Sequence, residues 1–562
     1  MRREVSVVNK KVCSFPILFA LLALLIGTCA VVFPASAQAA PTSTGSITVS
    51  GTVASSYDAY QIFSANVVDG DSDAKNATDL AWAGDAARDA VLPVLHSAGM
   101  PNSQTTAQEA AEWLNTDSHL TGALSAQLAR SLQSSGAVSV ALNAGTTAEL
   151  PCGYWLIVAD DDAIAQGEAG TAPIMALVGG SAVTVKPKAA TPKVAKHVLE
   201  DGTAAWQKAA DATVADDLYW RLSATVPAGL TAYDAYTVRF VDTMSAGLDS
   251  SKVAASMRVY VAAGADGGFD AVQTGKDGRA GTEPAKGWTD ITAQCATKVA
   301  ADGTFTVRTG DLIAALGGAD AFTAGARVVA VYNAPLNGAC NHGIAKGNPN
   351  EVYLRYPRSP LADQSGDAGF TRTPSDDACA YTWDLALTKR GSDGDKPLAG
   401  AVLSIADDRG RTLAADGTWD AEGKATVTTG EDGRVTVSGV DSGKLEVREL
   451  KAPKGYTAFE GTRSVTVKAE GLDVDQVAAA KPKLTITAES PLRADSADGS
   501  TGSLEASLIN TPTGTPPSIT TGGFMPSTGD MAMYAAAAAA VAGAALIVVA
   551  LLVKRGGGSH KE

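Results

Sequence analysis

Apolar and polar side chains alternate along residues 383–389, which read Trp383-Asp384-Leu385-Ala386-Leu387-Thr388-Lys389. Successive side chains of a β-strand point to opposite faces, so residues two positions apart share a face. Trp383, Leu385 and Leu387 therefore form one apolar face, and Lys389 falls on that same face. The stretch predicts a half-buried strand that directs a lysine amine into the core of a β-structure.

Two later stretches of the same segment place polar residues in phase with the core. Glu449 shares a face with the apolar residues of 445–449, and Asn510 shares one with those of 504–510. A first strand, a late strand and a last strand thus aim a lysine, an acid and an asparagine at one interior.

The preceding segment repeats this scheme. Lys196 is in phase with the valines two positions before and after it, and Asp242 is in phase with the apolar residues that precede it. Asn350 is in phase with the apolar residues that follow it, and Asn348 and Asn333 are alternatives for its role. Lysine, acid and asparagine again come from early, middle and last strands.

Buried lysines and carboxylates are costly unless they are paired or neutralised. Burial lowers the pKa of a lysine and raises that of an acid, and a neutral amine is a nucleophile. A protonated acid can donate a hydrogen bond to the asparagine carboxamide oxygen, which polarises the carboxamide carbon, and it can pass a proton to the departing nitrogen. Attack then expels ammonia and leaves a Lys–Asn isopeptide bond. The alternative is that these residues are polar groups at the solvated ends of strands.

Composition limits the other functions of the chain. Its 562 residues predict about three or four domains. The 57 glycines and the 6% of aromatic residues favour many short strands and turns. A net charge of −15 argues against nucleic-acid binding. The five histidines lack metal-ligand or catalytic spacing, and no other catalytic signature is recognisable, so we expect neither a metal, a cofactor nor an enzyme with turnover.

Both ends of the chain carry apolar runs. Residues 1–39 have a basic start, an apolar middle and a small-residue exit, which indicates a secretory signal peptide cut after Ala39 or Ala37. Residues 531–553 are apolar and long enough to cross a membrane, and the basic residues of 554–562 place that tail in the cytoplasm.

The residues before the second apolar run read Met525-Pro526-Ser527-Thr528-Gly529. This order of pentapeptide, apolar span and basic tail resembles the L-P-x-T-G sorting signal of Gram-positive surface proteins. The resemblance implies that a membrane sortase cuts between Thr528 and Gly529 and holds Thr528 as a thioester until an amine attacks it.

Residues 449–456 resemble the E-box of Gram-positive pilins and collagen-adhesin B-type domains, E-T-K-A-P-x-G-Y. The resemblance assigns the role of isopeptide-promoting acid to Glu449, between Lys389 and Asn510. Residues 191–360 resemble a collagen-adhesin A-like pilin domain, and the resemblance carries that chemistry onto Lys196, Asp242 and Asn350, with Asp242 as the acid.

Residues 183–188 resemble the pilin motif V-x-V-Y-P-K, whose final lysine attacks the sortase-held threonine of the next subunit. Lys188 falls on the face opposite the two valines of this motif, so we expect it to be exposed. Lys186 and Lys193 are nearby competitors, and a solvated linker lysine is the alternative. The first segment shows no early lysine on a core strand, so we expect no internal bond there.

The predicted architecture is mostly β, with tandem Ig-like (collagen-adhesin type) sandwiches after an N-terminal α+β pilin domain. Helix-like spacing occurs at 106–115 and 119–134, and strand-like stretches include 46–53, 154–159, 182–185, 236–241, 257–261, 326–332 and 351–356. The expected organisation is a signal peptide (1–39), an N-terminal pilin domain (40–188), an A-like domain (189–362), a B-type domain (378–512), a linker with the sorting motif (513–530), a transmembrane helix (531–553) and a basic tail (554–562).

The resemblance implies a major pilin of a sortase-assembled Gram-positive pilus that serves adhesion or colonisation at the cell wall. Its partners would be a sortase, further copies of itself, peptidoglycan and host-surface ligands. The alternative is a wall-anchored adhesin or a minor basal or tip pilin. The mature chain retains four cysteines, which allow three disulfide connectivities or none: Cys152, Cys295, Cys340 and Cys379.

Overall fold

The computed structural model describes residues 43–71, 74–116, 119–188, 191–264, 287–322 and 325–514. The signal peptide, the sorting motif with Thr528 and Gly529, the second apolar run and the basic tail lie outside these residues. Within the described ranges, none of the helices is long and apolar enough to cross a membrane.

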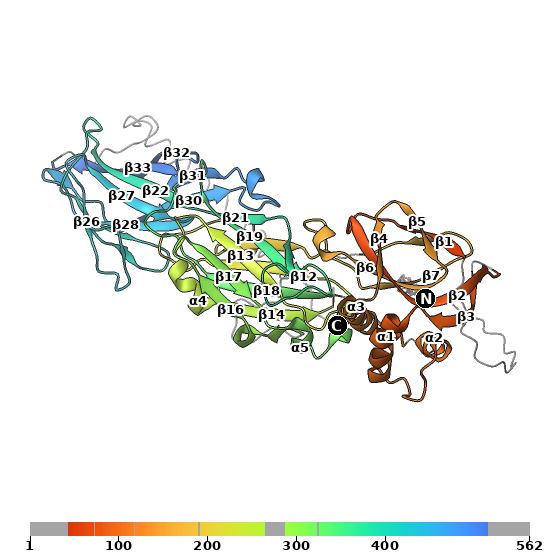
Figure 1. Cartoon of the computed structure of the whole chain (residues 1–562). Coiled ribbons are helices and arrows are strands. Elements are labelled where there is room, and N and C mark those ends of the chain that lie inside the picture. The colour runs from red at the N-terminus through yellow and green to blue at the C-terminus, as the bar shows by residue number, and fades with distance from the viewer. Residues whose placement is uncertain are drawn as a thin grey trace, which may run out of the picture.

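Three groups of strands follow one another along an elongated molecule (Figure 1). We call them the N-terminal region (44–185), the middle region (194–381) and the C-terminal region (383–512). Each contains two sheets that enclose buried apolar residues. The predicted mostly β architecture is confirmed.

The N-terminal region combines two sheets with a helical layer. One sheet has the order β5 (Thr147–Pro151), β1 (Thr44–Val49), β8 (Val183–Val185). The other has the order β3 (Lys75–Trp82), β2 (Ser56–Asp69), β6 (Gly153–Ala159), β7 (Ile174–Val178), with β4 (Ser139–Asn143) on β2. The helices are α1 (Asp85–Ser97), α2 (Ala107–Asn115) and α3 (Gly122–Ser134), and their apolar faces pack on the second sheet.

Local sequence explains which of these elements could be predicted. The two expected helices correspond to α2 and α3, and α2 begins with a capping box between Thr106 and Glu109. The sequence analysis missed α1, which has no side-chain cap at Gly84 and contains Pro93, a residue that usually interrupts a helix. The strand expected at 46–53 ends at Val49, shortly before Gly51 adopts a φ of 134°.

The middle region is a sandwich of two sheets. The first has the order β10 (Ala205–Gln207), β9 (Val194–Glu200), β12 (Tyr219–Val226), β18 (Ala326–Asn333), β14 (Arg258–Ala263), β15 (Thr289–Asp290). The second has the order β11 (Ala209–Asp211), β21 (Asp376–Tyr381), β19 (Asn348–Pro357), β13 (Arg239–Met244), β17 (Thr304–Arg308), β16 (Ala296–Val299), with β20 (Phe370–Arg372) on β19. Two short helices, α4 (Val253–Ser256) and α5 (Leu312–Ala315), complete it.

The C-terminal region is a second sandwich. One sheet has the order β27 (Arg434–Val440), β22 (Trp383–Gly391), β33 (Ser503–Pro512), β29 (Tyr456–Thr457), with β32 (Leu492–Asp498) on β33. The other has the order β25 (Trp419–Asp420), β24 (Thr412–Leu413), β23 (Val402–Ala406), β28 (Gly443–Lys451), β30 (Thr462–Glu470), β31 (Lys483–Ala488), with β26 (Val427–Thr428) on β23. The first strand, β22, pairs in parallel with the last, β33.

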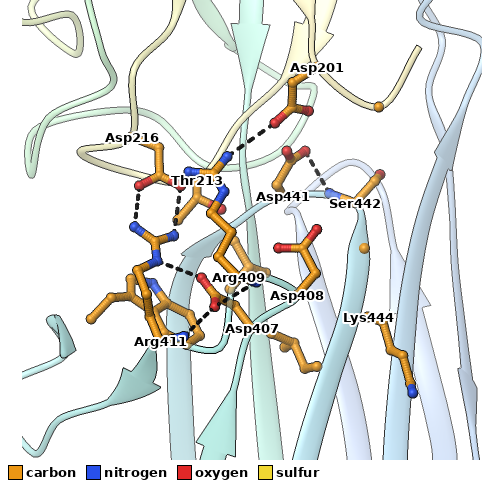
Figure 2. Close-up of a pocket in the computed structure, with 15 residues that line it drawn as sticks. Asp201, Thr213, Asp216, Asp407, Asp408, Arg409, Arg411, Asp441, Ser442 and Lys444 are labelled. Atoms are coloured by element: carbon orange, nitrogen blue, oxygen red, sulfur yellow. Dashed lines mark hydrogen bonds and ion pairs between the residues drawn. The ribbon is translucent and has the colours of Figure 1, made fainter. Parts of the chain in front are cut away.

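A buried polar joint connects the middle and C-terminal regions. Asp211, at the end of β11, accepts hydrogen bonds from Trp383 Nε1 at 2.6 Å and from the Ser442 backbone N–H at 3.0 Å. Figure 2 shows the pocket beside this joint, where Arg409 and Arg411 of the C-terminal region reach Asp216 of the middle region. Side chains from both regions are therefore tied together by hydrogen bonds and ion pairs.

The joint also contains two carboxyl groups whose pKa is raised by burial, Glu200 and Asp441. Burial raises the pKa of Glu200 to about 8, and the neighbouring charge of Asp211 adds to the effect. Burial likewise raises the pKa of Asp441 well above its ordinary value, and the charges of Asp211 and Asp201 add to the effect. The folded chain therefore favours the protonated form of these two carboxyl groups.

We predict that the joint weakens as the pH rises. The pKa of Glu200 is higher in the folded chain than in the unfolded one, so its stabilising contribution is complete below about pH 4.5 and is lost as the pH rises through about 8. The free energy of unfolding should fall by at most about 1.4 kcal/mol per pH unit for one proton. Thermal unfolding between pH 5 and pH 9 measures this, with Glu200→Gln reducing the slope. The exposed Glu446→Gln is the control, and equal slopes in all three proteins would contradict the prediction.

Candidate functional site

The C-terminal sandwich encloses a buried cluster of three polar side chains. Lys389 comes from β22, Asn510 from the adjacent β33 and Glu449 from β28 of the facing sheet. Lys389 and Asn510 are 0% and 2% exposed. In the β22–β33 ladder, Lys389 lies opposite Leu508 and Gly391 lies opposite Asn510, so the two side chains are diagonal neighbours.

Glu449 bridges the amine and the amide. Its Oε1 lies 3.2 Å from Lys389 Nζ, and Asn510 Nδ2 donates to both of its oxygens at 2.9 and 3.0 Å. Lys389 Nζ donates to Asn510 Oδ1, and the Phe459 backbone N–H donates to Glu449 Oε2 at 3.1 Å. The acid was expected to donate to the carboxamide oxygen, but it contacts the carboxamide nitrogen, while the oxygen faces the amine. This geometry suits a proton shuttle between the two nitrogens.

The middle sandwich encloses a second cluster, made of four fully buried side chains. Lys196 comes from β9 and Tyr332 from β18 of one sheet, while Asp242 and Asn350 come from β13 and β19 of the other. Lys196 Nζ contacts Asp242 Oδ2 and donates to the Tyr332 hydroxyl at 2.9 Å. Asn350 Nδ2 also donates to that hydroxyl at 2.9 Å. The sequence analysis did not assign a role to Tyr332.

Burial lowers the pKa of the lysine in both clusters. It lowers the pKa of Lys196 to about 8 against the opposing charge of Asp242, and it raises the pKa of Asp242. It also lowers the pKa of Lys389 to about 8 against the opposing charge of Glu449. Both amines therefore lose a proton more readily than a surface lysine and become nucleophilic at a lower pH.

The two alternative asparagines have other partners. Asn348 Oδ1 accepts from the Asn341 backbone N–H at 2.8 Å, and its Nδ2 donates to backbone carbonyls. Asn333 Oδ1 accepts from the Leu218 backbone N–H at 3.0 Å, and its Nδ2 donates to Asp217 at 2.6 Å. Of these three asparagines, Asn350 is the one that shares a described hydrogen-bond partner, Tyr332, with Lys196.

The N-terminal region presents exposed lysines near the end of β8. Lys188 is exposed three residues after this strand ends at Val185, and Lys186 and Lys193 are also exposed. A buried lysine that the sequence analysis missed is Lys75, at the polar start of β3. It donates to the carbonyl oxygens of Gly179 at 2.5 Å and Ser181 at 2.6 Å. Because the partners of this buried amine are backbone carbonyl oxygens, the expectation that the N-terminal region forms no internal bond stays a prediction.

The cysteines and the potential metal ligands of the described residues were the other candidates for a functional site. All four cysteines there are free: Cys152, Cys295, Cys340 and Cys379. Across the same residues, no group of three or more His, Cys, Asp or Glu side chains could hold a metal ion.

Comparisons with known proteins agree with this architecture in part. Residues 384–481, within the C-terminal region, match the SpaA family, which is described as a prealbumin-like fold domain. The trypsin-resistant surface T6 protein of Streptococcus pyogenes serotype M6 is 30% identical over 143 residues. That match covers 24% of each protein, so the chain spans about a quarter of the length of this curated relative.

Two solved structures resemble the whole described molecule more loosely. The T6 backbone pilin of serotype M6 Streptococcus pyogenes is 16% identical with a TM-score of 0.45, over 84% of this chain and 98% of that one. The full-length major pilin SpaD of Corynebacterium diphtheriae is 15% identical with a TM-score of 0.41, over 84% of this chain and 98% of that one.

Proposed function

We propose that the chain is a structural shaft subunit of a sortase-assembled pilus on a Gram-positive cell wall, strengthened by an internal Lys–Asn isopeptide bond in each of its two sandwiches. The observation that carries this proposal is the burial of a lysine, an acid and an asparagine together in both sandwiches. The SpaA domain match and the identity to a surface T6 protein support it.

The C-terminal cluster has the contacts that the reaction needs. Glu449 takes a proton from Lys389, and the neutral Nζ attacks the Asn510 carboxamide carbon. The new C–N bond forms as the C–Nδ2 bond breaks, and Glu449 delivers the proton with which the old nitrogen leaves as ammonia. The attacking nitrogen then gives its surplus proton to Glu449. Glu449 lies within hydrogen-bond distance of both nitrogens. The fold holds the reactants together, so proximity supplies much of the rate.

The position of the bonds suits a load-bearing role. Lys389 lies on the first strand of the C-terminal region and Asn510 on the last, 121 residues later. Tension that enters through β22 and leaves through β33 would pass across a covalent bond between these neighbouring strands. The chain between them would be shielded from the force, and its free length in the unfolded state would be reduced.

Assembly of the shaft would use the exposed lysine of the N-terminal region. Lys188 would attack the threonine acyl group at Thr528 of another copy, held by the sortase. Peptidoglycan would receive the last subunit, and host-surface ligands would bind the finished fibre. The chain itself would perform covalent chemistry once in each sandwich, without turnover.

We predict that the mature protein is lighter than its sequence by two molecules of ammonia. Intact-mass measurement of the purified chain checks this. Glu449→Ala should restore the mass of one ammonia, because the proton shuttle of the C-terminal site is lost. Glu446→Ala, at an exposed position of the same strand, should leave both bonds in place. A mass equal to the plain processed sequence would reject both internal bonds.

We also predict that Lys188→Ala abolishes the high-mass ladder of covalent polymers on the cell surface. The matched controls are Lys186→Ala and Lys193→Ala, because both lysines are exposed close to Lys188. Loss of the ladder in one control alone would move the role of nucleophile to that lysine. A ladder unchanged in all three variants would favour a wall-anchored adhesin that does not form the shaft.

A further inference from the structure

The two buried clusters differ in how the acid reaches the amide. In the C-terminal cluster, Glu449 touches the amide nitrogen of Asn510 directly. In the middle cluster, the described hydrogen-bond partner of Asn350 Nδ2 is the Tyr332 hydroxyl, at 2.9 Å. Aspartate is one methylene shorter than glutamate, and a phenol occupies the place between the acid and the leaving nitrogen.

The Tyr332 hydroxyl meets all three reacting side chains of the middle cluster. It donates to Asp242 Oδ2 at 3.1 Å and accepts from Lys196 Nζ and Asn350 Nδ2, each at 2.9 Å. The Tyr332 ring packs edge-on against Phe305, with the ring centroids 4.8 Å apart. The phenol is thus held at a fixed point among the reactants.

Solvent is excluded from this site. The four side chains of the cluster are each 0% exposed. A proton that moves from the acid to the leaving nitrogen must therefore travel through a protein group, and the Tyr332 hydroxyl is the group that contacts both ends of that path. Burial raises the pKa of Tyr332 well above its ordinary value, which keeps the phenol neutral and able to donate.

We propose that Tyr332 is a catalytic proton relay that joins Asp242 to the leaving nitrogen of Asn350. The inference rests on the proposed isopeptide chemistry and adds a fourth participant to the middle site. The C-terminal site needs no such relay, because Glu449 spans both nitrogens by itself.

Asp242 takes one proton from the Lys196 ammonium, and the neutral Nζ forms a bond to the Asn350 carboxamide carbon. Asp242 then gives its proton to the Tyr332 oxygen while the Tyr332 hydroxyl proton passes to Nδ2. The C–Nδ2 bond breaks, ammonia leaves, and the attacking nitrogen returns its surplus proton to Asp242. Tyr332 ends as the phenol that it was at the start.

The test is Tyr332→Phe in the full chain, which removes the hydroxyl and keeps the ring. Mass spectrometry of the joined Lys196–Asn350 peptides, followed in time after synthesis, measures the middle bond. We expect that bond to form about 100-fold more slowly, the low end of what a positioned acid–base group contributes. The Lys389–Asn510 bond in the same molecule should form at the normal rate and serves as an internal control for folding.

Two further variants keep the outcome decisive. Tyr356→Phe removes another buried phenol of the same sandwich, one that donates to the Gly167 carbonyl at 2.7 Å, and it should leave the middle bond at the wild-type rate. Adding Asp242→Glu to Tyr332→Phe should restore the bond, because the longer acid copies the direct contact of the C-terminal site.

The results separate this proposal from the one that it rests on. Absence of both bonds in the wild-type chain would overturn the proposed function together with the relay. Bonds present in the wild type and formed at an equal rate in Tyr332→Phe would overturn the relay alone. An equal slowing in Tyr356→Phe would also overturn the relay, because the effect would then belong to packing.

Discussion

The burial of a lysine amine inside a β-sandwich is the constraint on which the rest of this structure depends. An ammonium group in an apolar core must be paired with an acid, and the same loss of water that demands the acid also loosens the proton on the amine. Lys389 and Lys196 both show this, since burial lowers the pKa of each to about 8. The burial that makes each lysine unfavourable in its charged form thus also makes its amine more reactive.

The partners of a buried lysine distinguish a reactive site from a structural one. Lys75 and Lys208 are also buried, but their amines donate hydrogen bonds to backbone carbonyl oxygens and pair with partly exposed aspartates. Lys389 instead meets an acid and an asparagine, and the carboxyl group reaches both nitrogens. The combination of amine, acid and amide in one dry space, rather than burial alone, makes the isopeptide proposal specific.

Strand alternation shows how far sequence can locate these residues. Lys389, Glu449 and Asn510 were placed on core faces by their phase alone, and all three lie buried. Alternation cannot show which side chains meet across two sheets, so the contact of Tyr332 with Asp242 and Asn350 was missed. Bulges near Phe63 and Ser64 also break the phase of the long strand β2, which the sequence analysis did not identify.

The two clusters place the lysine and the asparagine differently with respect to the sheets. Lys389 and Asn510 lie on neighbouring parallel strands of one sheet, so a bond between them would resist shear along that pair. Lys196 and Asn350 lie on facing sheets, so a bond there would hold the sandwich closed. The polar joint around Asp211, by contrast, depends on hydrogen bonds and ion pairs. Under load, and with both bonds formed, bending and extension would therefore concentrate at the joint.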